Sequence, residues 1–141
     1  MTGRPPAHVL PVRVYYEDTD AAGIVYHANY LKFAERARTE LLREFGFDHR
    51  GLAGETGIAF AVSRCAMRFL APARLDDLLA VHTDVIDLSG ARLALEQRIH
   101  REEQLLVRLE LTLAVVDLAT LRPRRLPETL RQRFAAAIAG S

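Results

Sequence analysis

The chain has 141 residues, of which 50% are hydrophobic and 26% are charged, and its formal net charge is +1 at pH 7. This length and composition predict one globular domain over residues 1–141 and exclude a disordered chain. The near-neutral charge excludes a strongly basic surface for nucleic acid, the single cysteine excludes a disulfide framework, and no apolar run is long enough to span a membrane.

The N-terminal segment is not typical of a secretory signal. Residues 1–11 hold three prolines and no unbroken apolar stretch. We therefore expect a cytoplasmic protein with no nucleic acid partner and no stable membrane insertion. Residues 1–8 are expected to be flexible.

A strand, a loop and a long helix are predicted next. Residues 9–17 alternate in hydropathy, which predicts a strand, and the polar residues 18–23 predict a loop. The period then changes, and residues 29–46 predict an amphipathic helix of about five turns. Its apolar face holds Tyr30, Phe33, Ala34, Ala37, Leu41 and Phe45. Asn29 is a candidate N-cap, and Gly46 is a candidate C-terminal stop.

The remaining chain predicts four strands and a short helix. After a loop with Gly51, Gly54 and Gly57, strand periodicity covers residues 58–70, 77–88, 91–100 and 105–117. The short connections between consecutive strands indicate antiparallel hairpins. A segment led by Pro127 predicts a terminal helix. The fold class is therefore α+β, with the long helix on one face of an antiparallel sheet of about five strands. The other face of the sheet and its edges need cover, which favours a homo-oligomer.

The polar cluster between the first strand and the long helix is the candidate site. Asp18 and Asp20 supply carboxylates suited to base or nucleophile chemistry, and His27 supplies an imidazole, a common general acid or base. The N-terminus of the helix offers unpaired N–H groups that can stabilise an oxyanion. Each residue also has a structural interpretation: Asp18 as a hydrogen-bonding turn residue, His27 as a capping or interface residue, and Tyr16 as a core residue.

A long motif in this region resembles a known family. The stretch from Val12 to Phe47, VRVYYEDTDAAGIVYHANYLKFAERARTELLREFGF, closely resembles the hotdog-fold acyl-CoA thioesterases, and most of all the YbgC branch, which accompanies the Tol–Pal cell-envelope system. The similarity continues through APARLDD at residues 71–77 and PRRLP at residues 123–127. The resemblance implies a hotdog fold, in which a curved antiparallel sheet wraps a long helix, and assembly into homodimers or homotetramers.

The resemblance also implies roles for individual residues. Asp20 matches the family's catalytic carboxylate, acting as nucleophile or general base, and Tyr16 and His27 match residues placed around the site. The His27 amide falls where the helix N-terminus contacts the thioester carbonyl. Arg124 matches an arginine that reaches coenzyme A phosphates, and Arg92 is a candidate for the same contact. No metal and no bound cofactor are implied.

Sequence differences from related branches of the family narrow the range of expected acyl groups. The 4-hydroxybenzoyl-CoA thioesterases share the D-x-D-x-x-G core but carry a proline where this chain has Ala21, and another aromatic pair where it has Tyr26-His27. The resemblance therefore favours a short-chain aliphatic acyl group, carried by coenzyme A or by acyl carrier protein, over an aryl group. A hotdog dehydratase is disfavoured because Asp20 and His27 have no Asn-Pro between them.

Three further features leave alternatives open. Glu35 is predicted to pair with Arg38 one turn along the helix and is a reserve catalytic candidate. Cys65, in an apolar run, is predicted to be a core residue. Residues 121–133 carry five arginines and one glutamate, a local charge of +4. This charge suits a coenzyme A nucleotide or an acidic carrier protein, and the structural interpretation is a solvated helix face. The alternative function is therefore a non-catalytic scaffold that binds acyl carrier protein in cell-envelope or phospholipid biogenesis.

Overall fold

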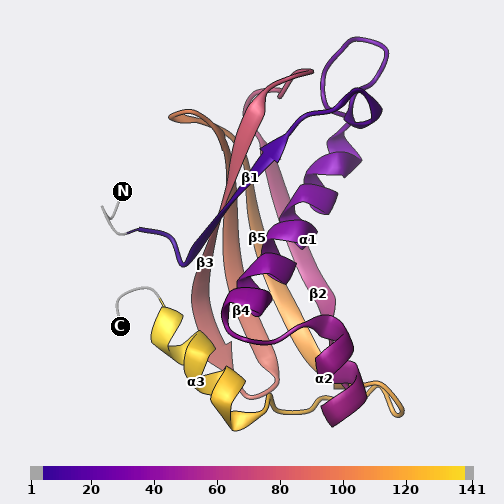
Figure 1. The fold of residues 1–141 in the computed structure, drawn as a ribbon, viewed down its shortest axis with the longest axis vertical. Coiled ribbons are helices and arrows are strands. Elements are labelled where there is room, and N and C mark those ends of the chain that lie inside the picture. The colour runs from indigo at the N-terminus through magenta and orange to yellow at the C-terminus, as the bar shows by residue number, and fades with distance from the viewer. Residues whose placement is uncertain (1–4, 139–141) are drawn as a thin grey trace.

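An antiparallel five-stranded sheet wraps around one long helix (Figure 1) in the computed structural model, which describes residues 5–138. The elements are β1 (His8–Arg13), a 3-10 turn (Tyr16–Asp18), α1 (His27–Glu44), α2 (His49–Thr56), β2 (Ile58–Phe69), β3 (Leu78–Ser89), β4 (Arg92–Arg101), β5 (Gln104–Asp117) and α3 (Glu128–Ala137). The strand order is β1-β3-β4-β5-β2, and every neighbouring pair is antiparallel. The predicted α+β class and five strands are confirmed.

The core lies between the concave face of the sheet and α1. The predicted apolar face of α1 is buried from Tyr30 to Leu41, with Phe33, Ala34 and Ala37 fully enclosed, whereas Phe45 lies just past the end of the helix and is partly exposed. On β4, Ile99 packs in the same cluster as these three enclosed residues, whereas Leu93 and Leu95 pack in a second buried cluster with Leu41. Because side chains alternate along a strand, the intervening charged residues of β4 lie on the outer face of the sheet.

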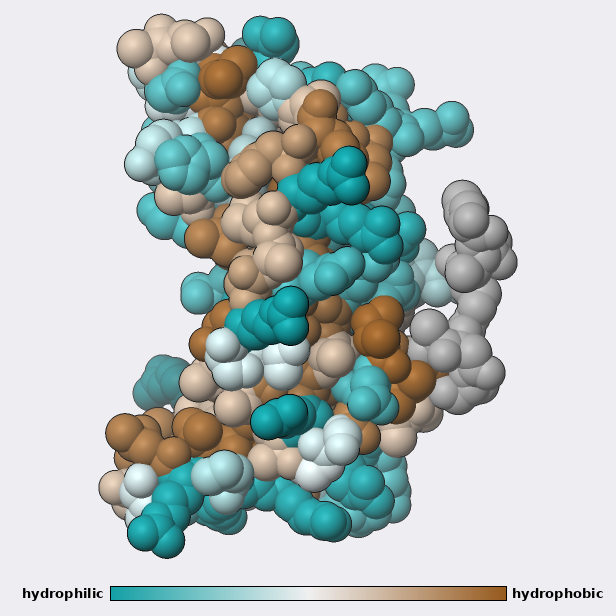
Figure 2. All heavy atoms as spheres, turned by 180° about the vertical axis from the view of Figure 1, so that it is seen from behind, coloured by the Kyte–Doolittle hydropathy of each residue, from teal (hydrophilic) through white to brown (hydrophobic). Residues whose placement is uncertain are grey.

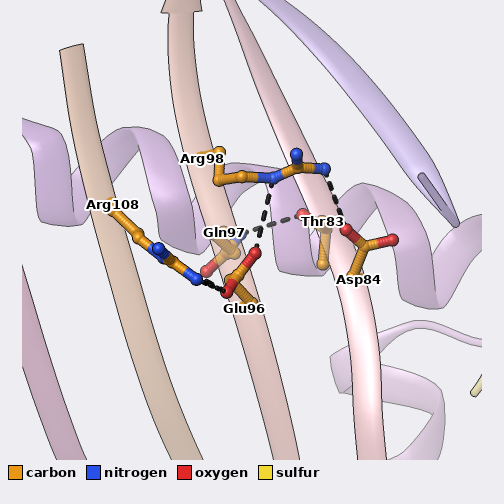
Figure 3. A network of polar contacts seen from close by, with 6 residues as sticks. All are labelled: Thr83, Asp84, Glu96, Gln97, Arg98 and Arg108. Atoms are coloured by element: carbon orange, nitrogen blue, oxygen red, sulfur yellow. Dashed lines mark hydrogen bonds and ion pairs between the residues drawn. The ribbon is translucent and has the colours of Figure 1, made fainter. Parts of the chain in front are cut away.

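The outer face carries an ion-pair network across three strands (Figure 3). Arg98 on β4 binds Asp84 on β3 at 2.9 Å and Glu96 at 3.5 Å, and Arg108 on β5 binds Glu96 at 2.7 Å. These contacts neutralise the charged side chains of this face against one another. Figure 2 shows this side of the molecule, on which hydrophilic and hydrophobic residues intermingle.

Local hydrogen bonding overrides the sequence pattern at the N-terminal end of α1. The predicted strand over residues 9–17 ends at Arg13, because the chain turns into a 3-10 helix and leaves Tyr16 83% exposed. The helix α1 begins at His27, not after Asn29, and its N-cap Tyr26 makes no side-chain cap. The predicted Asn29 cap is therefore wrong. Asn29 instead lies inside the first turn, buried, and donates to the Asp18 carbonyl at 2.8 Å.

The helix α2 replaces the predicted glycine-rich loop. Asp48 caps it by accepting from the Gly51 amide at 2.6 Å, and Gly57 ends it in the left-handed region at φ 71°. An N-cap and a C-terminal glycine outweigh the low helix propensity of the two internal glycines.

The strand β2 is an uncovered edge. It pairs with β5 on one side and with no other strand of the described residues, and most of its side chains are exposed. Cys65, predicted to be a core residue, is exposed because α1 does not cover this edge. Leu31, Val62, Phe69 and Leu70 are also exposed. In Figure 2 the margin that β2 forms is hollowed between the two ends of the molecule.

Two expectations concern the chain termini and membranes. Of residues 1–8, predicted to be flexible, 1–4 lie outside the described residues, and β1 already begins at His8. Within residues 5–138, no helix is both long and apolar enough to cross a membrane.

Candidate active site

The loop between β1 and α1 is fixed to the segment before β3. Bridges join Thr19 to Val25 and Ile24 to Arg74, and the Val25 amide donates to the Ala73 carbonyl at 2.9 Å. The hydroxyl of Tyr30, in the first turns of α1, accepts from the Ala73 amide at 3.0 Å. The segment before β3 therefore holds both the loop and the N-terminus of α1 in place.

Asp18 fixes the shape of this loop. Its carboxylate accepts from the Tyr15 amide at 2.8 Å, and its carbonyl accepts from the Tyr26 amide at 3.0 Å and from Asn29 Nδ2 at 2.8 Å. The residue is 9% exposed. The predicted role of Asp18 as a hydrogen-bonding turn residue is confirmed, because its Oδ2 and its carbonyl oxygen hold the loop to the Tyr15 amide and to the first turn of α1.

Asp20 presents one free carboxylate oxygen. Its Oδ1 accepts from the Ala22 amide at 2.9 Å and from the Ile24 amide at 3.4 Å. Gly23, at φ 77°, closes this turn in a conformation that favours glycine. Among the described residues Oδ2 has no hydrogen bond, and the side chain is exposed. The turn thus orients the carboxylate while leaving one oxygen for a ligand or a water.

The N-terminus of α1 supplies donors near this loop. His27 is the first helical residue, so its amide and that of Ala28 have no partner within the helix. The first turn contains no acidic residue to neutralise the positive end of the helix dipole. The His27 ring lies 4.5 Å from the Tyr26 ring and 6.4 Å from the Phe69 ring, centroid to centroid. The site therefore faces β2.

Tyr16 belongs to the same loop but not to the core. Its carbonyl accepts from the Thr19 amide and hydroxyl, at 3.2 and 2.9 Å. Its side chain points into solvent, and the interpretation of Tyr16 as a core residue is wrong.

The two arginines predicted to bind phosphate lie far from Asp20 within one chain. Arg124 donates to the carbonyl of Thr56, the last residue of α2, at 2.7 Å, and binds Asp117 at 3.0 Å. This is the end of the molecule opposite to the β1–α1 loop (Figure 1). The 18 residues of α1 span about 27 Å between these ends.

Arg92 lies beside a hollow that sequence patterns did not indicate. The hollow has a volume of about 680 Å³, and its lining includes Arg64 and Arg92 together with Ser63, Ser89 and Thr112. Neither Arg64 nor Arg92 has an ion pair among the described residues. Two free guanidinium groups and several hydroxyls suit a phosphate group.

Within residues 5–138, no group of three or more His, Cys, Asp or Glu side chains could hold a metal ion.

A second cavity lies between α1 and β2. Its volume is about 460 Å³, and Glu35 and Arg38 are among its walls. The predicted Glu35–Arg38 ion pair is absent from the described residues; Arg38 donates instead to Gln97 Oε1 at 3.0 Å. Burial lowers the pKa of Arg38 below its usual value, and the charge of Glu35 opposes this effect. Gln97, a fully buried polar residue within the apolar stripe of β4, was the sequence signal for this contact.

Asp77 stabilises the segment before β3 that holds the loop in place. Burial alone would raise the pKa of Asp77, but hydrogen bonds from Arg101 at 2.7 Å and from the Arg74 amide at 2.8 Å hold it below its ordinary value of 3.8. A carboxyl group with a lowered pKa stabilises the folded state above that ordinary value, and the contribution disappears as the pH falls through the folded-state pKa.

We expect Asp77→Asn to lower the free energy of unfolding by about 1 kcal/mol at pH 7. Urea denaturation at several pH values measures the effect. The difference between wild type and variant should shrink as the pH falls below about 4. A difference that stays constant down to pH 3 would contradict this role of the carboxylate.

The chain is similar to known proteins over most of its length. Residues 14–134 match the model of the thioesterase-like superfamily. The acyl-CoA thioesterase YbgC of Haemophilus influenzae is 46% identical over 125 residues, which cover 89% of this chain and 92% of the relative. The acyl-CoA thioester hydrolase YbgC of Escherichia coli O157:H7 is also 46% identical over 125 residues, 88% of this chain and 92% of the relative.

A solved structure shares the same architecture. The crystal structure of a probable thioesterase from Bartonella henselae superposes with a TM-score of 0.80 at 41% identity, and the match covers 85% of this chain and 98% of the other. The hotdog fold expected from the sequence is therefore confirmed.

Proposed function

This chain belongs to the thioesterase-like superfamily and is a thioester hydrolase, and we propose that it cleaves acyl-CoA with Asp20 as the catalytic carboxylate. The observation that carries this proposal is the turn at residues 20–24, which holds Oδ1 of Asp20 and leaves Oδ2 without a hydrogen bond among the described residues. The same loop leads directly into the N-terminus of α1, where N–H groups are available for the substrate carbonyl.

The thioester carbonyl binds at the N-terminus of α1 in this proposal. The amide of His27 donates to the carbonyl oxygen and stabilises the negative charge that develops on it, an effect worth about 3–4 kcal/mol per donor in other enzymes. Asp20 either attacks the carbonyl carbon, giving a mixed anhydride that water then hydrolyses, or removes a proton from the attacking water. The carbon–sulfur bond breaks, and coenzyme A leaves as the thiolate. His27 and Tyr16 orient the acyl group or the water.

The proposed substrate carries a short aliphatic acyl group, on coenzyme A or on acyl carrier protein. Ala21 and the Tyr26-His27 pair, which set this chain apart from the 4-hydroxybenzoyl-CoA branch, support an aliphatic group. Exposed Arg122, Arg125 and Arg133, which have no ion pair among the described residues, support an acidic carrier. A link to the Tol–Pal system or to phospholipid biogenesis, and a cytoplasmic location, stay predictions.

Thiol release measured on short, long and aromatic acyl-CoAs, and then on acyl carrier protein thioesters, tests this function. We expect the highest kcat/KM with a short aliphatic group. A folded protein that hydrolyses none of these thioesters but binds acyl carrier protein, and binds it equally well after Asp20→Ala, would support the scaffold alternative instead.

We also propose that the active unit is a homodimer formed along β2. The free edge of β2 carries unpaired backbone groups, and Leu31, Val62, Phe69 and Leu70 expose apolar surface beside it. Two copies of β2 paired antiparallel would bring the N-terminus of α1 of one copy next to the α2 end of the other. Asp20 of one copy would then lie near Arg124 of the second, which one chain alone keeps apart. Pairs of such dimers would form the tetramer.

In this dimer the hollow at Arg64 and Arg92 holds coenzyme A phosphates. We expect Arg64→Ala and Arg92→Ala each to raise KM for acyl-CoA about tenfold with little change in kcat, because one charged phosphate contact is lost. The matched control is Arg133→Ala, which removes an exposed arginine elsewhere. Acyl-pantetheine, which lacks the nucleotide, should be hydrolysed equally by all four proteins; an equal KM increase for acyl-pantetheine would contradict the assignment.

A further inference from the structure

A loop at one end of the molecule exposes two leucines that the proposed reaction does not use. It joins β5 to α3, covers residues 118–125, and projects beside α2 at the end opposite to Asp20 (Figure 1). Leu121 is 73% exposed and Leu118 is 47% exposed. Figure 2 shows hydrophobic residues gathered at this end, with hydrophilic residues directly beside them. Isolated exposed leucines are common on protein surfaces, whereas two in one projecting loop form a candidate contact surface.

Hydrogen bonds hold this loop in one shape. Asp117, at the end of β5, accepts from the Ala119 and Thr120 amides on Oδ1, at 2.8 and 3.1 Å. Its carbonyl accepts from the Leu121 amide at 2.7 Å, and its amide donates to the Arg122 carbonyl at 2.8 Å. The leucines are therefore presented on a fixed turn, and little conformational entropy is lost when they bind a partner.

Leu121 adopts a backbone conformation that leucine rarely takes. Its φ is 60°, in the left-handed region, which favours glycine and asparagine. Its side chain points into solvent, so packing within the chain does not explain a leucine at this position. Because strained residues cluster at ligand-binding positions, a contact outside the chain is the better explanation.

Unpaired positive charges lie directly beside the two leucines. Arg122 and Arg125 are exposed and have no ion pair among residues 5–138. Asp117 is the only acidic residue of positions 117–125, and it is bound to Arg124 at 3.0 Å. The surface that the loop offers to a partner is therefore apolar and positively charged.

We propose that the loop of residues 118–125 docks on the surface of an anionic lipid bilayer. Its two leucines insert at the boundary between headgroups and acyl chains, and Arg122 and Arg125 bind headgroup phosphates. A bilayer offers both chemistries in adjacent layers. An acidic carrier protein would match the arginines but would leave the two leucines in water. Two leucines and two arginines give a weak, reversible attachment and not a stable insertion.

Sedimentation with lipid vesicles tests this surface. The vesicles contain phosphatidylcholine alone, or phosphatidylcholine and phosphatidylglycerol in equal parts. The wild type should bind the anionic vesicles and not the neutral ones, and added salt should weaken the binding because it screens the arginine charges. Leu121→Asn should lower the partition coefficient about tenfold, since it removes an apolar side chain while asparagine tolerates the left-handed conformation. Arg122→Gln and Arg125→Gln should each lower it about fivefold.

Two matched control residues lie at the other end of the molecule. Leu78, at the start of β3, is 50% exposed, and Arg74 is exposed without an ion pair among the described residues. Leu78→Asn and Arg74→Gln should bind anionic vesicles within about twofold of the wild type. A wild type that binds no vesicles, or equal losses in the loop variants and the controls, would overturn the proposal.

A tryptophan probe shows whether the loop enters the bilayer. The chain contains no tryptophan, so Leu121→Trp and Leu78→Trp each introduce a single indole. With anionic vesicles, the emission of Leu121→Trp should shift to shorter wavelength, because the indole leaves water, and that of Leu78→Trp should not move. An unshifted emission of Leu121→Trp in the vesicle-bound protein would mean that the arginines adsorb alone, which would overturn the insertion of the leucines.

Other occupants of the loop give different results. An emission shift of Leu121→Trp with acyl carrier protein, and none with vesicles, would assign the loop to an acidic protein. A change in the mass of the assembly in Leu121→Asn, measured by light scattering, would place the loop between copies of the chain. Either result would overturn the lipid proposal. None of these measurements requires turnover, so they stand apart from the proposed hydrolysis at Asp20.

Discussion

Replacing Asp20 by asparagine should lower kcat/KM for acyl-CoA hydrolysis by about 10³-fold or more, in the upper part of the range for the loss of a general base. Asparagine keeps the size of the side chain and an oxygen that accepts from the Ala22 and Ile24 amides, so the turn should persist. What it loses is the negative charge needed to attack the carbonyl or to accept a proton from water. Steady-state thiol release measures the loss.

Glu17→Gln is the matched control for Asp20→Asn. Glu17 is an exposed carboxylate in the same loop, and its neutralisation changes the local charge by the same amount. We expect it to retain kcat/KM within about twofold of wild type. A tenfold or smaller loss in Asp20→Asn, or equal losses in the two variants, would show that Asp20 acts only through the local charge.

The second large effect on catalysis is expected from removing the backbone N–H of His27. His27→Pro deletes both the imidazole and the N–H that is proposed to bind the carbonyl oxygen, whereas His27→Ala deletes the imidazole alone. We expect kcat of His27→Pro to be about 10²-fold below that of His27→Ala, the usual cost of one oxyanion donor. The ratio of the two variants isolates the amide from the side chain.

The structure around His27 is compatible with proline. The first helical position favours proline, and Tyr26 before it is extended, at φ −63° and ψ 132°, as a residue before proline requires. The thermal midpoints of the two variants should therefore agree within a few degrees. Equal kcat values in two equally stable variants would contradict an oxyanion role for this amide.

The sequence predicts elements whose side chains repeat with a clear period. The apolar stripe of α1 and the alternating hydropathy of β4 and β5 predicted whether each element is a helix or a strand and which face is buried. Burial on one side determines the spacing of apolar residues along an element. The turn at Asp18 and Asp20 was placed correctly for a similar reason: short carboxylates compete well for backbone amides.

Features that depend on the order of strands could not be predicted. Cys65 has the surroundings of a core residue in the sequence, but β2 occupies an edge of the sheet and α1 leaves it uncovered. Arg38 has a glutamate one turn away on its own helix, yet it donates to Gln97 on β4. A local pattern cannot report a contact made across the core, and only the departure of Gln97 from the apolar stripe indicated it.

The location of Arg124 also could not be predicted from a local sequence pattern. Its family counterpart suggests contact with the substrate of the Asp20 site, whereas the fold ties it to Thr56 and Asp117 at the other end of α1. In the proposed dimer, a second copy brings the two ends together. The assembly is therefore part of the active site in our proposal, although no single-chain pattern describes it.

A structure of the Asp20→Asn variant with bound acyl-CoA would test the central claim most directly, because the variant should bind the thioester without cleaving it. We predict the carbonyl oxygen at about 2.7–3.1 Å from the His27 amide nitrogen, with residue 20 facing the carbonyl carbon. A thioester bound elsewhere, with its carbonyl distant from the N-terminus of α1, would contradict the account.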